Sequence, residues 1–352
     1  MGFDRDKLLR EAVGVIRPAD VDGLLVNDEK DVYYLTGYSC PGAKLLLTEK
    51  GKKVYFIDKM NFSLASGVLK VLRDVHIIPG QVMLNLKTVI REQKLKRIGI
   101  NLKSLSAVEY INLFGDKSKL ACHDMSSVIE NMRDKKNGYE IGVIKKAAEE
   151  TVKIWKKIKR EIRTGMSEKD LAGLADIFVR GGGYENSFTT IAATGPNTAY
   201  PHAIATDRKL DKNEHLYIDF GVRYKGYCSD LTRTYYNGRI NRQIRDFEKL
   251  VLKAQDMAIK RIKPGVAIGK VAVEVNTFFR KNGVGQYILH SLGHGVGLNV
   301  HEKPFLHELC GERFKKGMVV TVEPGLYKAG CGGVREEDMV LVTDKGCEVL
   351  TK

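Results

Sequence analysis

The chain has 352 residues, of which 43% are hydrophobic and 29% are charged, a composition typical of a water-soluble globular protein with room for two domains. No run of about 18 apolar residues occurs, so no membrane-spanning helix is expected. The formal net charge is +15, but the excess lysines are spread along the chain. Their densest block, residues 153–163, has apolar residues at helical spacing, which indicates a solvated helix face rather than a nucleic-acid-binding surface.

The N-terminal residues mix acidic and basic side chains and lack the apolar core of a secretory signal. The six cysteines are scattered and form no Cys-x-x-Cys pair, which indicates free thiols in a reducing compartment. We therefore expect a cytoplasmic protein with no membrane partner.

Residues 1 to about 130 alternate short apolar runs with longer amphipathic stretches. The apolar runs predict strands at 23–26, 45–48, 54–57 and 98–100. The amphipathic stretches predict helices at 7–15, 61–72, 82–92 and 107–114. Alternation of this kind is typical of an α/β domain with a central sheet.

The composition changes near residues 132–139, where the chain becomes polar and contains a glycine. Segments between domains are commonly polar and exposed, so we place the domain boundary there. The predicted domains are 1–134 and 135–352.

The second domain begins with a long predicted helix over 141–162, whose apolar residues form one stripe, and Gly165 lies beyond its end. Ser167 and Asp170 have the spacing of a capping box that opens the next helix, over 171–180. Two further helices are predicted in this otherwise strand-rich domain, near 245–260 and 269–282.

A strand pair is predicted over residues 216–236, because both flanks are rich in aromatic and β-branched residues. A turn at residues 224–225 would place Asp219 directly opposite Asp230 on one face of the pair. Two buried carboxylates in this position repel each other, so they require a cation or a shared proton. The alternative is a pair of solvated acids on an exposed strand face.

A second strand pair is predicted over residues 317–342, with a glycine-rich connection between two β-rich flanks. A hairpin centred on Gly330 would set Glu323 opposite Glu337, although the length of the connection allows other registers. Pro324 suits a strand that ends at that point or lies at a sheet edge. Two opposed acid pairs favour a metal site more strongly than one.

Three of the eight histidines fall in the glycine-rich segment 290–304, where glycines flank His294 and allow close approach of the backbone. Four carboxylates and an imidazole favour Mn, Co, Fe or Zn over a thiolate-bound ion. This number of ligands is enough for two ions that share bridging carboxylates, an arrangement suited to hydrolysis by an activated water. His202, in a polar segment that contains proline, is a further candidate, with a purely structural role as the alternative.

Six motifs in one order resemble those of the pita-bread metallopeptidases: Asp-Phe-Gly (219–221), Ser-Asp-Leu-Thr-Arg-Thr (229–234), Gly-His-Gly-Val-Gly (293–297), His-Glu-x-Pro (301–304), Glu-Pro-Gly (323–325) and Gly-Val-Arg-x-Glu-Asp (333–338). Within this group the sequence is most similar to the Xaa-Pro peptidases, aminopeptidase P and prolidase. The resemblance covers roughly residues 138–350. A looser resemblance to the creatinase/prolidase-type first domain rests on residues 22–26 and 34–37.

The resemblance implies an α+β protein, with a C-terminal pita-bread (creatinase/aminopeptidase-like) catalytic domain and a smaller N-terminal α/β domain of the creatinase/prolidase, ribonuclease-H-like type. It implies an exopeptidase that hydrolyses the bond before proline in Xaa-Pro peptides by a hydroxide bridging two metal ions. The implied cofactors are two divalent ions, Mn²⁺ first, with Co²⁺, Fe²⁺ or Zn²⁺ as alternatives. The implied partners are a peptide with proline at its second position and a second copy of the chain in a homodimer.

The resemblance also implies residue roles. The implied metal ligands are Asp219, Asp230, His294, Glu323 and Glu337. Asp230 and Glu337 would bridge the two ions, and Glu323 would also exchange a proton with the activated water. The implied catalytic residues are His202, His301 and Glu323, and the implied substrate contacts are His202, His290 and His301. Thr232 and Arg335 would orient the ligating carboxylates.

Three alternatives stay open. Aminopeptidase P and prolidase share these motifs, and dipeptide selectivity requires a cation for the free carboxylate, for which Arg208 and Arg313 are candidates. Methionine aminopeptidase shares the catalytic fold, but the roughly 130-residue first domain and the motif at 229–233 favour the Xaa-Pro peptidases. A non-catalytic pita-bread protein that binds nucleic acid or protein is the third alternative, against which the retention of all five ligands argues.

Overall fold

The computed structural model describes residues 3–115 and 119–352, which form two compact units. The first unit ends at Arg133 and the second begins at Asp134. The six cysteines are all free thiols. Among the described residues, no helix combines the length and the apolar character that a membrane span requires.

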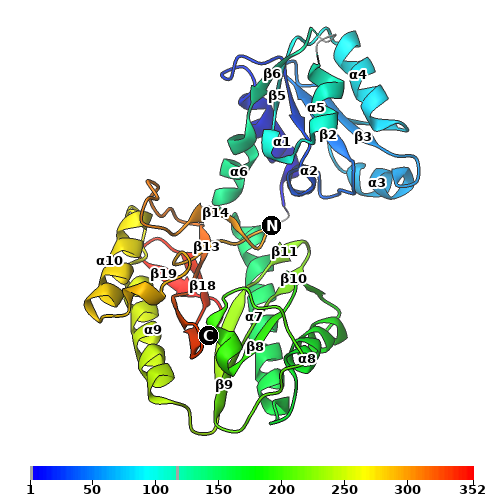
Figure 1. Ribbon diagram of the computed structural model, residues 1–352. Coiled ribbons are helices and arrows are strands. Elements are labelled where there is room, and N and C mark those ends of the chain that lie inside the picture. The colour runs from blue at the N-terminus through cyan, green and yellow to red at the C-terminus, as the bar shows by residue number, and fades with distance from the viewer. Residues whose placement is uncertain (1–2, 116–118) are drawn as a thin grey trace. The chain divides into compact units, whose positions relative to one another are not determined.

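The first unit is built on a six-stranded sheet surrounded by helices (Figure 1). The strand order is β4-β3-β2-β1-β5-β6, in which β2 runs antiparallel to both of its neighbours and the other pairs are parallel. The strands are β1 (Gly23–Val26), β2 (Lys44–Thr48), β3 (Lys53–Ile57), β4 (Val75–Pro79), β5 (Arg97–Ile100) and β6 (Ala121–Asp124). The helices are α1 (Arg5–Gly14), α2 (Glu29–Thr36), α3 (Phe62–Leu69), α4 (Val82–Glu92), α5 (Ala107–Phe114) and α6 (Ser126–Asp134), with a 3-10 turn η1 (Leu102–Ser104).

The four strands and four helices predicted in this unit are present, and β4, β6, α2 and α6 are additional. The two additional strands lie at the edges of the sheet and are half-exposed. An edge strand can carry polar residues on its exposed positions, so it has no continuous apolar run to reveal it. The central strands are buried along nearly their whole length, which is why their apolar runs were visible in the sequence.

The second unit contains two halves, each with a helix pair packed on a sheet (Figure 1). In one half, α7 and α8 pack on a sheet of order β12-β9-β8, and in the other, α9 and α10 pack on a sheet of order β14-β13-β15-β18-β19. The helices are α7 (Gly138–Glu161), α8 (Glu168–Gly181), α9 (Arg242–Arg261) and α10 (Ile268–Lys281), with 3-10 turns η2 (Gly195–Ala199) and η3 (Gly285–Tyr287). The main strands are β8 (Ile191–Thr194), β9 (Glu214–Phe220), β12 (Leu231–Asn237), β13 (His294–Gly295), β14 (Glu302–Phe305), β15 (Val319–Val322), β18 (Asp338–Val342) and β19 (Cys347–Val349). Two small sheets complete the unit, formed by β7 (Glu185–Asn186), β10 (Val222–Tyr224) and β11 (Tyr227–Cys228), and by β16 (Gly325–Lys328) and β17 (Gly332–Arg335).

The four predicted helices of this unit are confirmed, and each begins slightly before its apolar stripe. The capping box predicted for α8 is present, with Ser167 and Asp170 each accepting a backbone N–H from the other. Capping residues are polar and lie outside the stripe, so the apolar pattern alone places the helix start too late.

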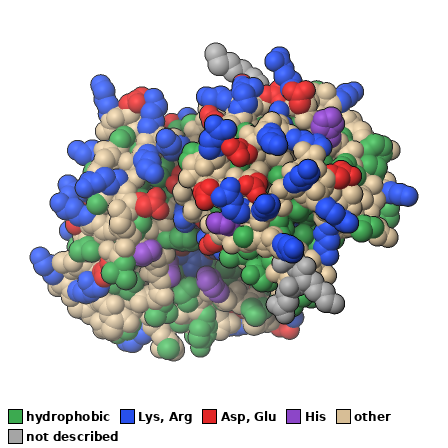
Figure 2. Space-filling view, turned by 90° about the horizontal axis from the view of Figure 1, so that it is seen from above, with side chains coloured by type: hydrophobic (Ala, Val, Ile, Leu, Met, Phe, Trp, Pro, Cys, Tyr) green, Lys and Arg blue, Asp and Glu red, His purple; other side chains and the backbone are tan. Residues whose placement is uncertain are grey.

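The predicted solvated helix face is confirmed in α7. Ile154 and Ile158 are buried against the sheet, whereas Lys153, Lys156 and Lys157 are exposed. Figure 2 shows Lys and Arg side chains distributed over the face in view, with acidic side chains between them. The positive charge therefore does not gather into one patch on this face.

The first predicted hairpin has a different register from the expected one. Lys225 and Gly226 form its turn, both with positive φ, and Tyr224 pairs with Tyr227. The turn lies one residue later than predicted, so Asp219 pairs with Thr232 and not with Asp230. A two-residue turn with positive φ at both positions matches the twist of the strands that it joins, and glycine favours that conformation at the second position.

The register predicted for the second hairpin is confirmed on both sides of the acidic pair. Val322 pairs with Asp338, and beyond a break of two residues Gly325 pairs with Arg335. Glu323 and Glu337 lie at the break, where neither belongs to a strand. Strand β15 ends before Pro324, as a residue without a backbone N–H requires.

Candidate metal centre

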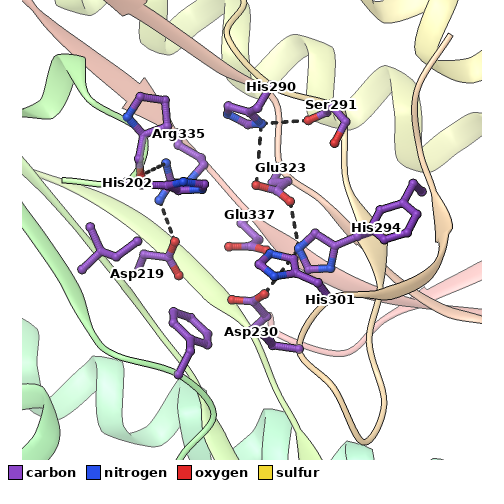
Figure 3. Close-up of a pocket in the computed structure, with 15 residues that line it drawn as sticks. His202, Asp219, Asp230, His290, Ser291, His294, His301, Glu323, Arg335 and Glu337 are labelled. Carbon is purple, nitrogen blue, oxygen red and sulfur yellow. Dashed lines mark hydrogen bonds and ion pairs between the residues drawn. The ribbon is translucent and has the colours of Figure 1, made fainter. Parts of the chain in front are cut away.

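Five acidic and imidazole side chains from both halves of the second unit line one cavity of about 340 Å³ (Figure 3). They are the five expected metal ligands: Asp219 on β9, Asp230 directly before β12, His294 on β13, Glu323 directly after β15 and Glu337 directly before β18. Local alternation explains the direction of Asp219, because its neighbours Ile218 and Phe220 enter the core beneath α7 and α8. The cavity therefore lies where strand ends of the two sheets meet.

Three of these side chains can contact one ion at the same time. Asp230, His294 and Glu337 each offer a ligand atom, and these atoms lie within 4.8 Å of one another. Glu323 extends the group, since its Oε1 lies 3.1 Å from His294 Nε2. His294 Nδ1 lies 3.1 Å from the carbonyl oxygen of Gly295, which can only accept, so Nδ1 carries the proton and Nε2 is left to bind an ion.

Asp219 occupies the other side of the group. Its Oδ2 accepts a hydrogen bond of 2.6 Å from the guanidinium of Arg335. Its Oδ1 is buried and has no hydrogen-bond partner among the described residues. A buried carboxylate oxygen without a partner is costly, so a cation bound at this atom would satisfy it.

Arg335 and Thr232 connect the carboxylates from behind. Arg335 Nε donates to Thr232 Oγ1 over 3.0 Å, and Thr232 Oγ1 donates to Glu337 over 2.7 Å. Arg335 thereby contacts Asp219 directly and Glu337 through Thr232. These contacts match the orienting role expected for both residues, although that role stays a prediction.

The electrostatics of the cluster also fit a bound cation. Burial raises the pKa of Asp230 and Glu337 well above the ordinary carboxyl range, and the charges of neighbouring carboxylates raise it further. Burial acts on Glu323 in the same direction, but the hydrogen bond and charge of His294 outweigh it and lower the pKa of Glu323. Divalent ions would supply the positive charge that these groups otherwise obtain from protons. The donor atoms are oxygen and imidazole nitrogen, so the residues present fit Mn, Co, Fe or Zn.

His202 and His301 both line the cavity and are exposed to solvent. The ring of His301 lies edge-on to that of His294, with 4.1 Å between the centroids. Burial and the charge of His294 lower the pKa of His301, which favours its neutral form at pH 7. The structure thus brings both histidines to the rim of the predicted metal site.

His290 lines the cavity in a different way. Its Nδ1 contacts the carbonyl oxygen of Ser291 at 2.8 Å, and its Nε2 contacts the hydroxyl of Tyr327 at 2.8 Å. Arg335 donates to the same hydroxyl over 2.9 Å, so Tyr327 donates its own proton to His290. Both ring nitrogens are therefore engaged within the protein, and His290 presents mainly its ring to a substrate.

Sequence reasoning missed Tyr327 and the apolar residues of the cavity. Phe188, Ile191, Val300 and Phe305 line it together with the polar groups. None of these residues carries a chemical group that marks it in a sequence, and only Tyr327 lies close to a recognised motif, two residues after Glu-Pro-Gly.

The two arginines considered for dipeptide recognition do not line the cavity. Arg208 is paired with Glu214, and Arg313 donates to the carbonyl oxygen of Gly265. Of the described residues that line the cavity, Arg335 is the only lysine or arginine, and it is bound to Asp219.

Comparison with known proteins agrees with this geometry. Residues 142–344 match metallopeptidase family M24, and residues 10–135 match the creatinase/prolidase N-terminal domain. The chain belongs to metallopeptidase family M24. The predicted pita-bread family and two-domain creatinase-like fold are thereby confirmed.

The relatives are Xaa-Pro peptidases. The Xaa-Pro dipeptidase of Pyrococcus furiosus is 31% identical over 346 residues, which cover 98% of this chain and 97% of the relative. The solved Xaa-Pro dipeptidase of Bacillus anthracis has a TM-score of 0.93 and 29% identity, covering 99% of this chain and 98% of its own. The solved X-Pro aminopeptidase of Thermotoga maritima has a TM-score of 0.89 and 29% identity, covering 98% of this chain and 97% of its own.

These findings support a metal-dependent Xaa-Pro exopeptidase over the two other enzyme and binding alternatives. They do not separate dipeptidase from aminopeptidase, since this M24 chain is similar to both kinds of protein.

Proposed function

We propose that this M24 enzyme is a dinuclear exopeptidase that hydrolyses the bond before proline in Xaa-Pro peptides. The observation that carries the proposal is the group of five buried or half-buried ligand side chains, with one oxygen of Asp219 left unpartnered. Four carboxylates can balance the charge of two divalent ions, and a single ion would leave this surplus uncompensated. When bound, such ions supply an activated water at neutral pH and polarise the scissile carbonyl.

The side chains around the metal site have separate tasks in this proposal. Glu323 lies beside His294 at the edge of the ligand group, where its carboxylate can take a proton from the attacking water and return it to the leaving amine. His202 and His301 lie at the cavity rim, where an imidazole N–H can donate to the developing oxyanion. One such donor contributes on the order of 100- to 1000-fold in rate.

The apolar part of the cavity supports proline as the second residue. Phe188, Ile191 and Phe305 line it, and the ring of His290 adds a flat surface. Proline has no backbone N–H to satisfy once its bond to the preceding residue is formed, and its pyrrolidine ring is apolar. Such a ring gains from burial against these side chains without leaving an unpaired donor.

We further propose that the enzyme prefers peptides that continue beyond proline over Xaa-Pro dipeptides. A dipeptide would bring its free carboxylate into this cavity, where Arg335 is the only described lysine or arginine and already binds Asp219. An unpaired carboxylate in a partly desolvated site costs roughly 1–3 kcal/mol. A longer peptide carries a neutral amide at the same place.

The test compares Ala-Pro, its amide Ala-Pro-NH₂, Ala-Pro-Ala and Met-Ala-Ala as substrates, with Mn²⁺ or Co²⁺ added to metal-depleted enzyme. We expect cleavage of the two extended or amidated proline substrates at a kcat/KM about tenfold or more above that of Ala-Pro. Faster cleavage of the free dipeptide would overturn the length preference, and efficient cleavage of Met-Ala-Ala alone would overturn proline selectivity.

Three further expectations from the sequence stay predictions: manganese as the metal used in the cell, a homodimeric assembly and a cytoplasmic location.

A further inference from the structure

Glu168 is a fully buried carboxylate at the start of α8, with 0% of its surface exposed. The cap of this helix does not use it, because Ser167 and Asp170 form the capping box between themselves. The side chain therefore has another partner, and that partner is the segment that carries His202.

The two oxygens of Glu168 hold the two ends of residues 195–206, here called the His202 loop. Oε1 accepts from the backbone N–H of Thr194 over 2.8 Å and from its hydroxyl over 3.1 Å. Oε2 accepts from the backbone N–H of Thr206 over 3.0 Å and from its hydroxyl over 2.6 Å. The side-chain amide of Asn197 donates to both oxygens, at 3.0 and 3.2 Å.

Every one of these partners is a neutral donor, and a carboxylate is the side chain that only accepts. Hydrogen bonds to a charged acceptor are stronger than those between neutral groups, and the N-terminus of α8 adds a favourable field. Glu168 is thus suited to hold a loop in one conformation, because a carboxylate buried without these donors would be strongly disfavoured.

The middle of the His202 loop is attached to the metal site. The hydroxyl of Tyr217 donates to the carbonyl oxygen of Tyr200 over 2.6 Å, and Arg335 donates to the carbonyl oxygen of Pro201 over 3.2 Å. The ring of His202 itself makes no hydrogen bond to any residue in the described part of the chain. The position of this ring in the cavity therefore depends on the backbone of the loop (Figure 3).

We propose that Glu168 is a positioning residue, which holds both ends of the His202 loop and thereby places His202 at the reacting carbonyl. The proposal rests on the proposed function, in which His202 contacts the substrate. Misplacement of a catalytic group by about 1 Å can cost on the order of 100-fold in rate, so the loss of these hydrogen bonds has a large expected effect.

The test is Glu168→Gln, which keeps the size of the side chain but replaces one acceptor oxygen with a donor facing other donors. Asp170→Asn is the matched control, because it damages the cap of the same helix without touching the loop. We expect Glu168→Gln to raise hydrogen exchange in residues 195–206 at least tenfold and to lower kcat/KM for Ala-Pro-Ala by 10- to 100-fold. Metal content should not change, and Asp170→Asn should leave exchange in the loop at the wild-type level.

A second measurement asks whether Glu168 acts through His202. In a His202→Ala background, Glu168→Gln should cause little further loss of kcat/KM, because the group that it positions is already absent. Full additivity of the two losses, or wild-type exchange in the loop of Glu168→Gln, would overturn the role of Glu168. Failure of the wild-type enzyme to cleave any proline peptide would instead overturn the proposed function, and the exchange result would still show whether Glu168 holds the loop.

Discussion

At the residue scale, the metal centre is defined by carboxylates that are poorly placed without a cation. Asp230 and Glu337 are 4% and 1% exposed, and the other carboxylates of the group lie beside them. Burial and mutual repulsion favour their protonated forms, whereas metal ligation requires the ionised forms. Two consequences can be measured.

Asp230→Asn should abolish metal binding at the site and reduce turnover by at least about 1000-fold while the fold stays intact, because an amide brings no negative charge to a bridging position. Metal content by elemental analysis, circular dichroism and turnover with added Mn²⁺ check this together. The surface variant Asp344→Asn, which removes an exposed partner of Lys316, is the control. Full activity of Asp230→Asn would refute the ligand assignment.

Metal binding should release protons near neutral pH. The pKa values of Asp230 and Glu337 are raised in the metal-free fold, so these groups retain protons at pH values where ordinary carboxyls are ionised. An incoming ion displaces those protons, so apparent affinity for Mn²⁺ should rise as pH increases from about 5 to 7. Calorimetric titration in two buffers of different ionisation enthalpy measures the number released. Equal heats in both buffers would contradict proton release.

At the scale of elements, short breaks in the strands turn ligands toward the cavity. Asp230, Glu323 and Glu337 all stand just outside a strand, where the ladder stops and the side chain is free of strict alternation. The segment around His301 is held differently. Glu302, the next residue, forms an ion pair of 2.8 Å with Lys136, and these two side chains are 9% and 1% exposed.

Lys136→Met should therefore destabilise the protein by roughly 3–5 kcal/mol, because it leaves the charge of Glu302 buried without this partner. Turnover should also fall, since Glu302 adjoins His301. The matched control is Lys316→Met, whose pair with Asp344 is exposed and should contribute about 0–1 kcal/mol. Urea denaturation of both variants provides the comparison. Equal, small losses would show that the buried pair has no special importance.

At the scale of the whole molecule, charge and pH act on the fold in ways that the site does not reveal. The net charge of +15 is spread over the surface in view with acidic side chains between the basic ones (Figure 2). One buried histidine adds a dependence on pH. His215 is 4% exposed, and its Nε2 lies 3.1 Å from the carbonyl oxygen of Gly333.

Burial lowers the pKa of His215 from 6.5 to about 4. The folded state then binds fewer protons than the unfolded state between these values, so the stabilisation is complete above pH 6.5 and is lost as pH falls toward 4. This group should contribute roughly 3 kcal/mol to the loss across that window. Urea denaturation followed by the fluorescence of Trp155, the single tryptophan, measures it. His215→Gln should show a shallower loss; identical pH profiles would exclude His215 as the cause.

Much of this protein was determined by sequence-local patterns. Apolar periodicity and capping residues predicted the helices of both units, and residues 317–342 predicted the register around Glu323 and Glu337 because that hairpin is symmetric about Gly330. The histidines and carboxylates of the cavity were also all candidates from the sequence. These features depend on neighbouring residues, whose preferences are readable one segment at a time.

Only the tertiary structure decided how those segments meet. The first hairpin turns at Lys225–Gly226, one residue from the expected place, and a shift of this size changes which residues face each other. Arg335 contacts Asp219 across 116 residues of sequence, and Glu168 holds a loop that begins 26 residues later. Such contacts depend on packing between distant elements, which no local pattern encodes. The sequence therefore named the ligands, whereas the fold decided their neighbours, their charge state and the absence of a free lysine or arginine among the described residues of the cavity.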